Sequence, residues 1–161
     1  MKKVISIASI LFVAVISTAC INNLAVQDLN NKAKAYAEKG DYTQAIERLK
    51  SGIDLDPSIF ETHYNLAVVY TQAEDYINAI NEYKTVIKLK PEYAYAHYNL
   101  ACAYIKLGKY SKAKYELLTA IDLKNTVADF HYNLALVYKK LNKEKDAKRY
   151  IEYYNKLMEN E

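Results

Sequence analysis

His-Tyr-Asn-Leu-Ala occurs three times in the chain, at residues 63–67, 97–101 and 131–135, and both intervals are 34 residues. Other residues recur at the same interval. They are Tyr36, Tyr70, Tyr104 and Tyr138; Tyr42, Tyr76 and Tyr110; Ala45, Ala79, Ala113 and Ala147; Leu55, Leu89, Leu123 and Leu157; and Pro57 and Pro91. A five-residue identity repeated at one period does not arise by chance in 161 residues, so the chain is an array of repeated units.

The spacing within one unit predicts two amphipathic helices. In the first, His63, Leu66, Ala67 and Tyr70 stand at i, i+3, i+4 and i+7, which places them on one face of a helix. A second apolar stripe follows within residues 76–90. Alanines recur in both stripes and allow the two helices to approach closely.

The ends of the helices also carry recognisable residues. Gly40 and Gly108 predict the turn between the two helices of a unit. Asp41, Ser58 and Thr126 are each followed three residues later by Gln, Glu or Asp, a spacing that predicts capping boxes at helix starts.

The recurring residues resemble the tetratricopeptide repeat, which runs from an aromatic residue through Leu-Gly/Ala, Tyr, a Gly turn, Tyr and Ala to Pro. The second unit has His63, Leu66, Ala67, Tyr70, Tyr76, Ala79, Tyr83, Leu89 and Pro91 in that order, and the third has His97, Leu100, Ala101, Tyr104, Gly108, Tyr110, Ala113, Leu117, Ala120 and Leu123. Departures are His for the usual Trp, Lys32 for Leu, Glu144 for Tyr and Asn125 for Pro.

This resemblance implies an all-α fold, a right-handed α-solenoid of four helix-turn-helix units. The units are residues 26–59, 60–93, 94–127 and 128–161, and together they form one domain over 26–161. In such an array each helix pair leaves an apolar face that the next pair covers.

The N-terminus is typical of an export signal, which we expect to span residues 1–19. Lys2 and Lys3 precede an apolar stretch at 4–16, and small residues then lead into Cys20. The apolar stretch is shorter than the roughly 20 residues of a membrane span, although an uncleaved anchor helix is an alternative.

Ala19-Cys20 resembles the bacterial lipobox, in which the cysteine becomes lipidated and forms the new N-terminus; here Ser17 stands where Leu is usual. The resemblance implies a lipid anchor at Cys20, a short tether over 20–25 and a lipoprotein of the bacterial cell envelope. A freely secreted or periplasmic protein is the alternative.

Charge argues against nucleic-acid binding. Without Lys2 and Lys3, 20 basic residues face 19 acidic residues, a formal balance of +1, whereas nucleic-acid binding requires a basic face. The partners we expect are therefore a protein or peptide and, through the lipid, a membrane. Tyr150 and Tyr153, if exposed, would also permit a weak homodimer.

The sequence predicts a binding protein and not an enzyme. His63, His97 and His131 lie one unit apart, too far to share a metal ion, and replace the packed Trp of the family. No acidic residue recurs beside them in the sequence to orient them as bases. Cys102 has only Lys106 nearby to activate it, so we interpret it as an apolar filler. We expect no metal, no cofactor and no catalytic residue.

Tyr64, Tyr98 and Tyr132 lie about 200° around the helix from the leucine stripe. In the family this side lines the concave groove, so we expect these rings to point into the groove, away from the helix-packing stripe. The groove residues are predicted to be Tyr64, Asn65, Val68, Tyr95, Tyr98, Asn99, Cys102, Tyr132, Asn133 and Leu136. The alternative is that Tyr and Asn are simply common in this repeat.

Family members that bind chaperone tails carry Lys or Arg at the places of Tyr64, Tyr98 and Tyr132, so that activity is not expected here. The remaining hypotheses are an envelope adaptor that binds a protein segment, an assembly or pilot component of an outer-membrane machine, and a surface or secreted factor that contacts other cells.

We predict that Cys20→Ala removes the lipid anchor, because the thiol is the acylation site. The variant should move from the membrane to the soluble exported fraction or accumulate as an unprocessed precursor. Cell fractionation with a fatty-acid probe measures this. A wild-type protein that is fully soluble and unlabelled by the probe would contradict the lipoprotein hypothesis.

Overall fold

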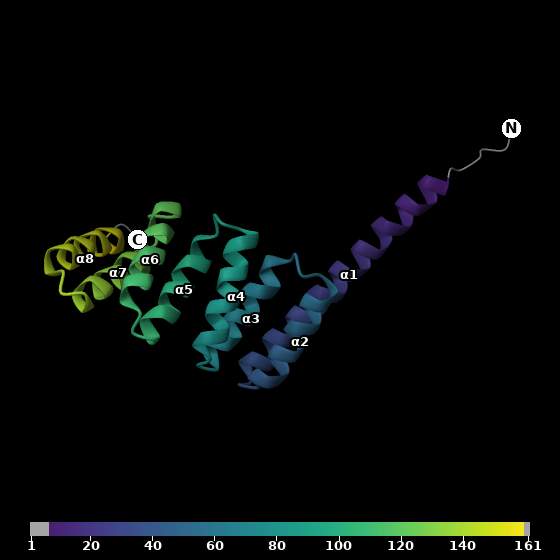
Figure 1. Ribbon diagram of the computed structural model, residues 1–161, viewed down its shortest axis with the longest axis horizontal. Helices are drawn as coiled ribbons and strands as arrows, with labels where there is room; N and C mark the ends of the chain where they lie inside the picture. Colours follow the sequence, from purple (N-terminus) through teal and green to yellow (C-terminus); the bar gives the residue numbers. More distant parts are fainter. Residues whose placement is uncertain (1–6, 160–161) are drawn as a thin grey trace.

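The computed structural model describes the backbone over residues 7–159 and the side chains from residue 21 onward. This part of the chain is helical and contains no strand. The helices are α1 (Ile7–Glu38), α2 (Tyr42–Leu55), α3 (Phe60–Gln72), α4 (Tyr76–Leu89), α5 (Ala94–Lys106), α6 (Tyr110–Leu123), α7 (Ala128–Lys140) and α8 (Glu144–Met158). They stack in consecutive pairs along one long axis, which confirms the predicted α-solenoid of helix-turn-helix units (Figure 1).

The first helix begins earlier than the repeat period predicts. Residues 21–25, expected as a tether, continue α1, so they rise only about 1.5 Å per residue instead of spanning an extended connection. Ile21 and Leu24 are exposed, and the buried part of the helix begins at Val26. The N-terminal part of α1 projects beyond the stacked pairs (Figure 1). Within residues 21–159, whose side chains are described, no helical segment is long and apolar enough to cross a membrane.

Small side chains allow the two helices of each pair to approach closely. Ala45, Ala79 and Ala113 in the second helices are completely buried, as are Ala67 and Ala101 in the first helices. The large side chains of one core cluster fill the space around these contacts, and the largest that are fully buried are Leu49, Leu66, Tyr83, Leu100, Leu117 and Leu134. The apolar stripes predicted from the 34-residue period are therefore the core.

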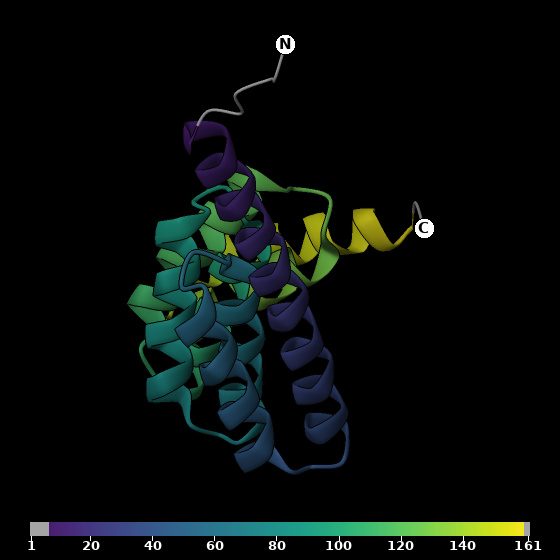
Figure 2. The same ribbon diagram turned by 90° about the vertical axis from the view of Figure 1, so that its right-hand side faces the viewer.

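The first helices of successive units form the inner side of the solenoid. Each helix packs against its neighbours in sequence, and in addition α1 contacts α3 and α5 contacts α7. Such contacts between alternate helices require the first helices to approach each other closely, which places them on the concave side. Successive pairs also rotate about the axis, so that α8 runs across the direction of α1 (Figure 2).

Each pair turns through a residue with positive φ, and these residues are 34 apart. Gly40 and Gly108 have φ of 78° and 68°, as predicted, and Glu74 and Asn142 occupy the same place with φ of 59° and 57°. The N–H of the residue after each positive-φ residue donates to the carbonyl of the tyrosine five positions earlier, which also recurs every 34 residues. In the second unit, Asp75 N donates to Tyr70 O at 2.8 Å. This is the hydrogen bond of a Schellman motif, which closes the helix end.

Two aspartates cap second helices. Asp41 Oδ1 accepts a hydrogen bond from the N–H of Gln44 at 3.1 Å, which confirms the predicted N-cap. Asp75 accepts one from the N–H of Asn78 at 3.2 Å, an N-cap that the sequence analysis missed.

The other two predicted capping boxes are wrong. Ser58 donates its hydroxyl to Asp56 at 2.6 Å within the loop, and α3 starts at Phe60 without a side-chain cap. Similarly, α7 starts after Val127, one residue beyond Thr126, and has no side-chain cap. In both helices a backbone hydrogen bond closes the first turn instead, from the N–H of Thr62 to the carbonyl of Ile59 and from the N–H of Phe130 to the carbonyl of Val127.

We predict that Glu74→Gly raises the free energy of unfolding by about 1 kcal/mol, because glycine adopts the left-handed conformation without the Cβ clash of other residues. Urea unfolding measures the change. Gly108→Ala is the matched control and should lower stability by a similar amount, since a Cβ there meets no atom within 4 Å and only the backbone is strained. Equal stability of Glu74→Gly and wild type would contradict the expected strain at Glu74.

Candidate functional site

Amide and phenol side chains form a hydrogen-bonded ladder along the inner helices. Asn99 Nδ2 donates to the hydroxyl of Tyr64 at 2.8 Å, and Asn133 Nδ2 donates to the hydroxyl of Tyr98 at 2.7 Å. Asn65 makes the equivalent bond to Asn30 Oδ1 at 3.2 Å. Each of these bonds joins the first helix of one unit to the first helix of the unit before it.

The expectation that Tyr64 and Tyr98 point away from the packed helices is wrong. The Tyr64 ring centroid lies 5.2 Å from that of Tyr93, and the Tyr98 ring stacks on Phe130 at 4.7 Å. Burial raises the pKa of both phenols far above the ordinary value of about 10. Both rings therefore pack between units, and their hydroxyls stay protonated as members of the ladder. Only Tyr132, which is 41% exposed, presents its ring to solvent as predicted.

The inner side is hollowed at two places. The first hollow, about 480 Å³, lies between α1 and α3, and the second, about 570 Å³, lies between α5, α7 and the start of α8. Tyr64, Asn65 and Val68 line the first hollow, and Asn133 and Leu136 line the second.

The remaining predicted groove residues lie outside these hollows. Tyr98 and Asn99 belong to the ladder, and Cys102 lies half-buried. Tyr95 joins an aromatic cluster at the starts of the helices, where its ring centroid is 5.7 Å from that of Phe130. Lys124 Nζ lies 5.0 Å above the Tyr95 ring. The structure thus brings the predicted residues onto one side of the molecule without bringing them into one pocket.

Burial raises the pKa of the Cys102 thiol to about 11. The thiol is therefore protonated near neutral pH, whereas the thiolate is the nucleophilic form. Cys102 acts as a small apolar side chain between α5 and its neighbours.

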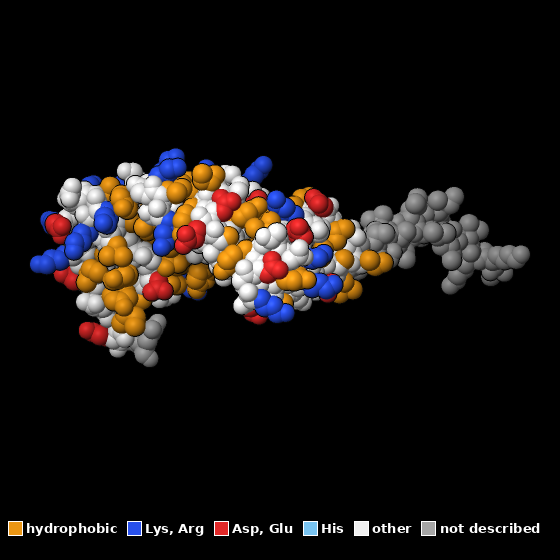
Figure 3. Space-filling view, turned by 90° about the horizontal axis from the view of Figure 1, so that it is seen from below, with side chains coloured by type: hydrophobic (Ala, Val, Ile, Leu, Met, Phe, Trp, Pro, Cys, Tyr) orange, Lys and Arg blue, Asp and Glu red, His pale blue; other side chains and the backbone are white. Residues whose placement is uncertain are grey.

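Several groove residues were missed by sequence reasoning. In the first hollow these are Asn30, Asn31, Lys34 and Gln72, and in the second Asn142. Asn30 could have been found, because it lies 34 residues before Tyr64. Amides dominate the first hollow, and amides can both donate to and accept from an extended peptide backbone. On the face drawn in Figure 3, acidic and basic side chains are interspersed with hydrophobic ones.

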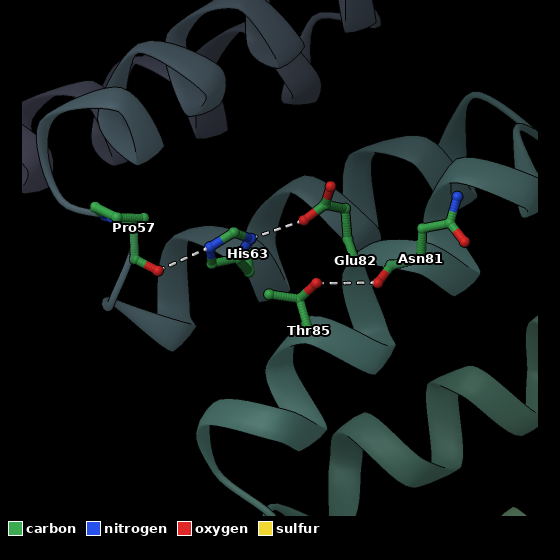
Figure 4. A network of polar contacts seen from close by, with 5 residues as sticks. All are labelled: Pro57, His63, Asn81, Glu82 and Thr85. Carbon is green, nitrogen blue, oxygen red and sulfur yellow. Dashed lines mark hydrogen bonds and ion pairs between the residues drawn. The ribbon is translucent and has the colours of Figure 1, made fainter.

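The histidines hold the units together through partners that the sequence analysis missed. His63 Nδ1 lies 2.7 Å from Glu82 Oε2, and its Nε2 lies 3.1 Å from the Pro57 carbonyl oxygen (Figure 4). His97 repeats the arrangement with Glu116 at 2.8 Å. The expectation that no acid orients the histidines is thus wrong for His63 and His97: their glutamates follow 19 residues later, on the second helix of the pair.

Through these contacts, each histidine joins the first helix of its unit to the second helix and to the loop that precedes the unit. A carboxylate and a carbonyl oxygen both accept hydrogen bonds, so both contacts are satisfied together when the imidazole carries a proton on each nitrogen. The hydrogen bond to Glu116 raises the pKa of His97 above its ordinary value of about 6.5, against the opposing effect of burial. Within residues 21–159, no group of three or more His, Cys, Asp or Glu side chains is placed to hold a metal ion.

The sequence matches the family described as TPR repeat over residues 33–73, 69–108 and 101–142, and the tetratricopeptide repeat over residues 128–159. The chain belongs to the tetratricopeptide-repeat family. No curated protein matches this tetratricopeptide-repeat chain in sequence.

Solved structures share the fold. MamA residues 41 to the end from Desulfovibrio magneticus RS-1 are 23% identical, with 84% of this chain and 77% of that chain covered and a TM-score of 0.79. Another crystal structure of MamA is 22% identical over 97% and 96% of the two chains, with a TM-score of 0.81. The first TPR domain of Spaghetti, bound to the HSP90 peptide SRMEEVD, is 22% identical over 74% and 94%, with a TM-score of 0.71.

We predict that the stability of this tetratricopeptide-repeat protein falls as the pH rises through the raised pKa of His97. The contribution of the His97–Glu116 pair is complete below the unfolded value of about 6.5 and is lost above the folded value, because deprotonation removes one of the two donors. Glu116→Gln should weaken this dependence. Urea unfolding from about pH 6 to pH 9 measures it.

Glu92→Gln is the control. Glu92 is exposed, so its substitution removes the same charge without changing a contact of His97. A Glu116→Gln variant with an unchanged pH profile would show that the pair contributes nothing in this range.

Proposed function

We propose that this chain is a protein-protein interaction scaffold of the bacterial cell envelope that binds a peptide or protein segment along its inner side. The observation that carries the proposal is the pair of hollows on the concave side of a tetratricopeptide solenoid. The solved Spaghetti domain shares this fold and is bound to a peptide, which supports the same class of ligand here.

The second hollow and the exposed part of α7 beside it, which carries Tyr132, have the chemistry of a protein-binding surface. Tyr132 and Leu136, each 41% exposed, lie on consecutive turns of α7. Tyr132 is held by Tyr154, whose ring centroid is 5.2 Å away, so little side-chain entropy remains to be lost on binding. Lys139 and Lys140 on one side and Glu144 on the other supply polar contacts at the rim.

The first hollow suits the backbone of an extended segment. Its polar lining is mainly neutral, with Asn31, Asn65 and Gln72 beside one charge of each sign at Lys34 and Glu38. We infer that the two hollows bind different parts of one ligand: the amides of the first bind its backbone, and Leu136 in the second, together with Tyr132 beside it, binds an apolar side chain.

We further propose that Cys20 carries the lipid that holds the scaffold at a membrane. The exposed apolar side chains of Ile21 and Leu24 support this position, because they lie at the end of the solenoid next to the anchor. With residues 21–25 helical, the first unit would begin about 9 Å from the lipidated residue. The solenoid would therefore stand close to the bilayer surface.

We predict that Tyr132→Ala and Leu136→Ala each weaken binding by about 2 kcal/mol, because each removes an exposed apolar contact from the proposed groove. Crosslinking in intact envelopes followed by purification identifies the ligand, and calorimetry with that ligand measures the affinity. Thermal unfolding of each variant separates lost binding from lost folding.

Matched controls exist on the second helices. Tyr115 and Ile77 are 68% and 67% exposed, so Tyr115→Ala and Ile77→Ala remove similar side chains from the opposite side of the solenoid. They should bind normally. If the controls lose affinity while Tyr132→Ala and Leu136→Ala keep it, the ligand binds the convex side instead.

A further inference from the structure

A third cavity, about 450 Å³, lies in the last unit and outside the inner side of the solenoid. It is formed by the end of α6, the loop that follows, the start of α7, and α8. Ile121 and Leu157 give it apolar walls, and the rings of Tyr150 and Tyr153 cover the imidazole of His131. Neither of the two hollows on the inner side includes these residues.

The cavity borders the position at which earlier units carry a carboxylate, since Tyr150 lines it. Glu82 pairs with His63, and Glu116 pairs with His97, in each case 19 residues after the histidine. The residue 19 positions after His131 is Tyr150. The fourth unit has therefore kept the histidine and lost its acidic partner.

His131 consequently has a buried nitrogen without a partner. His131 is only 5% exposed, and its Nε2 lies 2.9 Å from the carbonyl oxygen of Asn125. Its Nδ1 is buried and, within the part of the chain whose side chains are described, has no hydrogen-bond partner. A buried polar atom left unpaired is costly, so a ligand that pairs with it gains the energy of that bond.

The chemistry of the histidine in the other units indicates which ligand would pair with this nitrogen. Among the described residues that line the cavity, none is acidic, so no carboxylate of the lining faces His131. Because Nε2 donates to Asn125, a carboxylate at Nδ1 binds with uptake of one proton from solvent, which leaves both ring nitrogens protonated and able to donate, as the two contacts of His97 also require. A ligand that donates to Nδ1 would have no such precedent in the other units.

We propose that this cavity binds a carboxylate carried by an apolar group, with His131 Nδ1 as the hydrogen-bond donor. The carboxylate takes the place that Glu82 and Glu116 fill in the second and third units. Tyr150 packs against the core on Tyr138, whereas Tyr153 is 50% exposed, so the Tyr153 ring is the one that turns aside to admit the ligand. The source is either an acidic side chain of a protein segment or a free carboxylic acid.

Titration of the full chain with matched probes tests this assignment. Capped Leu-Glu-Leu and Leu-Gln-Leu peptides form one pair, and benzoate and benzamide form the other. We expect the carboxylate of at least one pair to bind about tenfold more tightly than its amide, as hydrogen bonds to charged groups do. In ¹⁵N spectra of the histidine side chains, both ring nitrogens of His131 should move to the positions of protonated nitrogens, while His63 and His97 stay unchanged.

A charge-restoring variant sharpens the test. Tyr150→Glu supplies the carboxylate within the chain, so it should lower the affinity for the carboxylate probe about tenfold and should melt at a higher temperature than Tyr150→Gln. Tyr150→Gln is the matched control: it removes the same ring without a carboxylate and should retain the preference for acid over amide. His97→Gln, which leaves the cavity intact, should bind the probes as wild type does.

The outcomes separate cleanly. Tighter binding of the peptide assigns the site to a protein segment, and tighter binding of benzoate assigns it to a small acid. If acid and amide bind equally in both pairs, or if the His131 nitrogens do not respond, the proposal is overturned, whether or not Tyr150→Glu folds. None of these results depends on a ligand at the inner side.

Discussion

The close approach of the two helices in each pair is the constraint on which the structure depends. Each second helix faces the first helix of its pair with a completely buried alanine, so there is no room for a larger side chain. These alanines are Ala45, Ala79 and Ala113. Larger residues at these positions would separate the helices and open the contact to the next pair. The pairs must therefore form almost identically, and this is why alanine recurs at the repeat period.

Contacts between units differ from the apolar contacts within a pair, because polar and aromatic side chains make many of them. The Asn–Tyr ladder joins the inner helices, and each histidine bonds the loop that enters its unit through the carbonyl of Pro57, Pro91 or Asn125. These bonds have direction, unlike apolar packing, and so they specify how far each pair rotates relative to the one before. The curvature that produces the inner hollows follows from that rotation.

Much of the fold was predictable because it repeats along the chain. The helix stripes, the glycine turns and the cap at Asp41 depend on residues within a few positions of one another. The Glu82 partner of His63 was missed, since 19 residues separate them and only the helix hairpin brings them together. Tyr98 was misplaced for a related reason: position around a helix predicts the side on which a ring emerges, but Phe130 of the next unit decides whether it stays exposed.

The fourth unit shows how a repeat acquires a site. In the second and third units the glutamate satisfies the histidine within the chain, so both side chains are committed to stability. In the fourth, the loop bond to Asn125 persists, and Tyr150 packs on Tyr138 and on the His131 ring in place of the ion pair. Packing of this kind holds the last helix without using Nδ1. A nitrogen that earlier units need for folding is thereby left to an external group, at the end of the array where the fewest contacts depend on it.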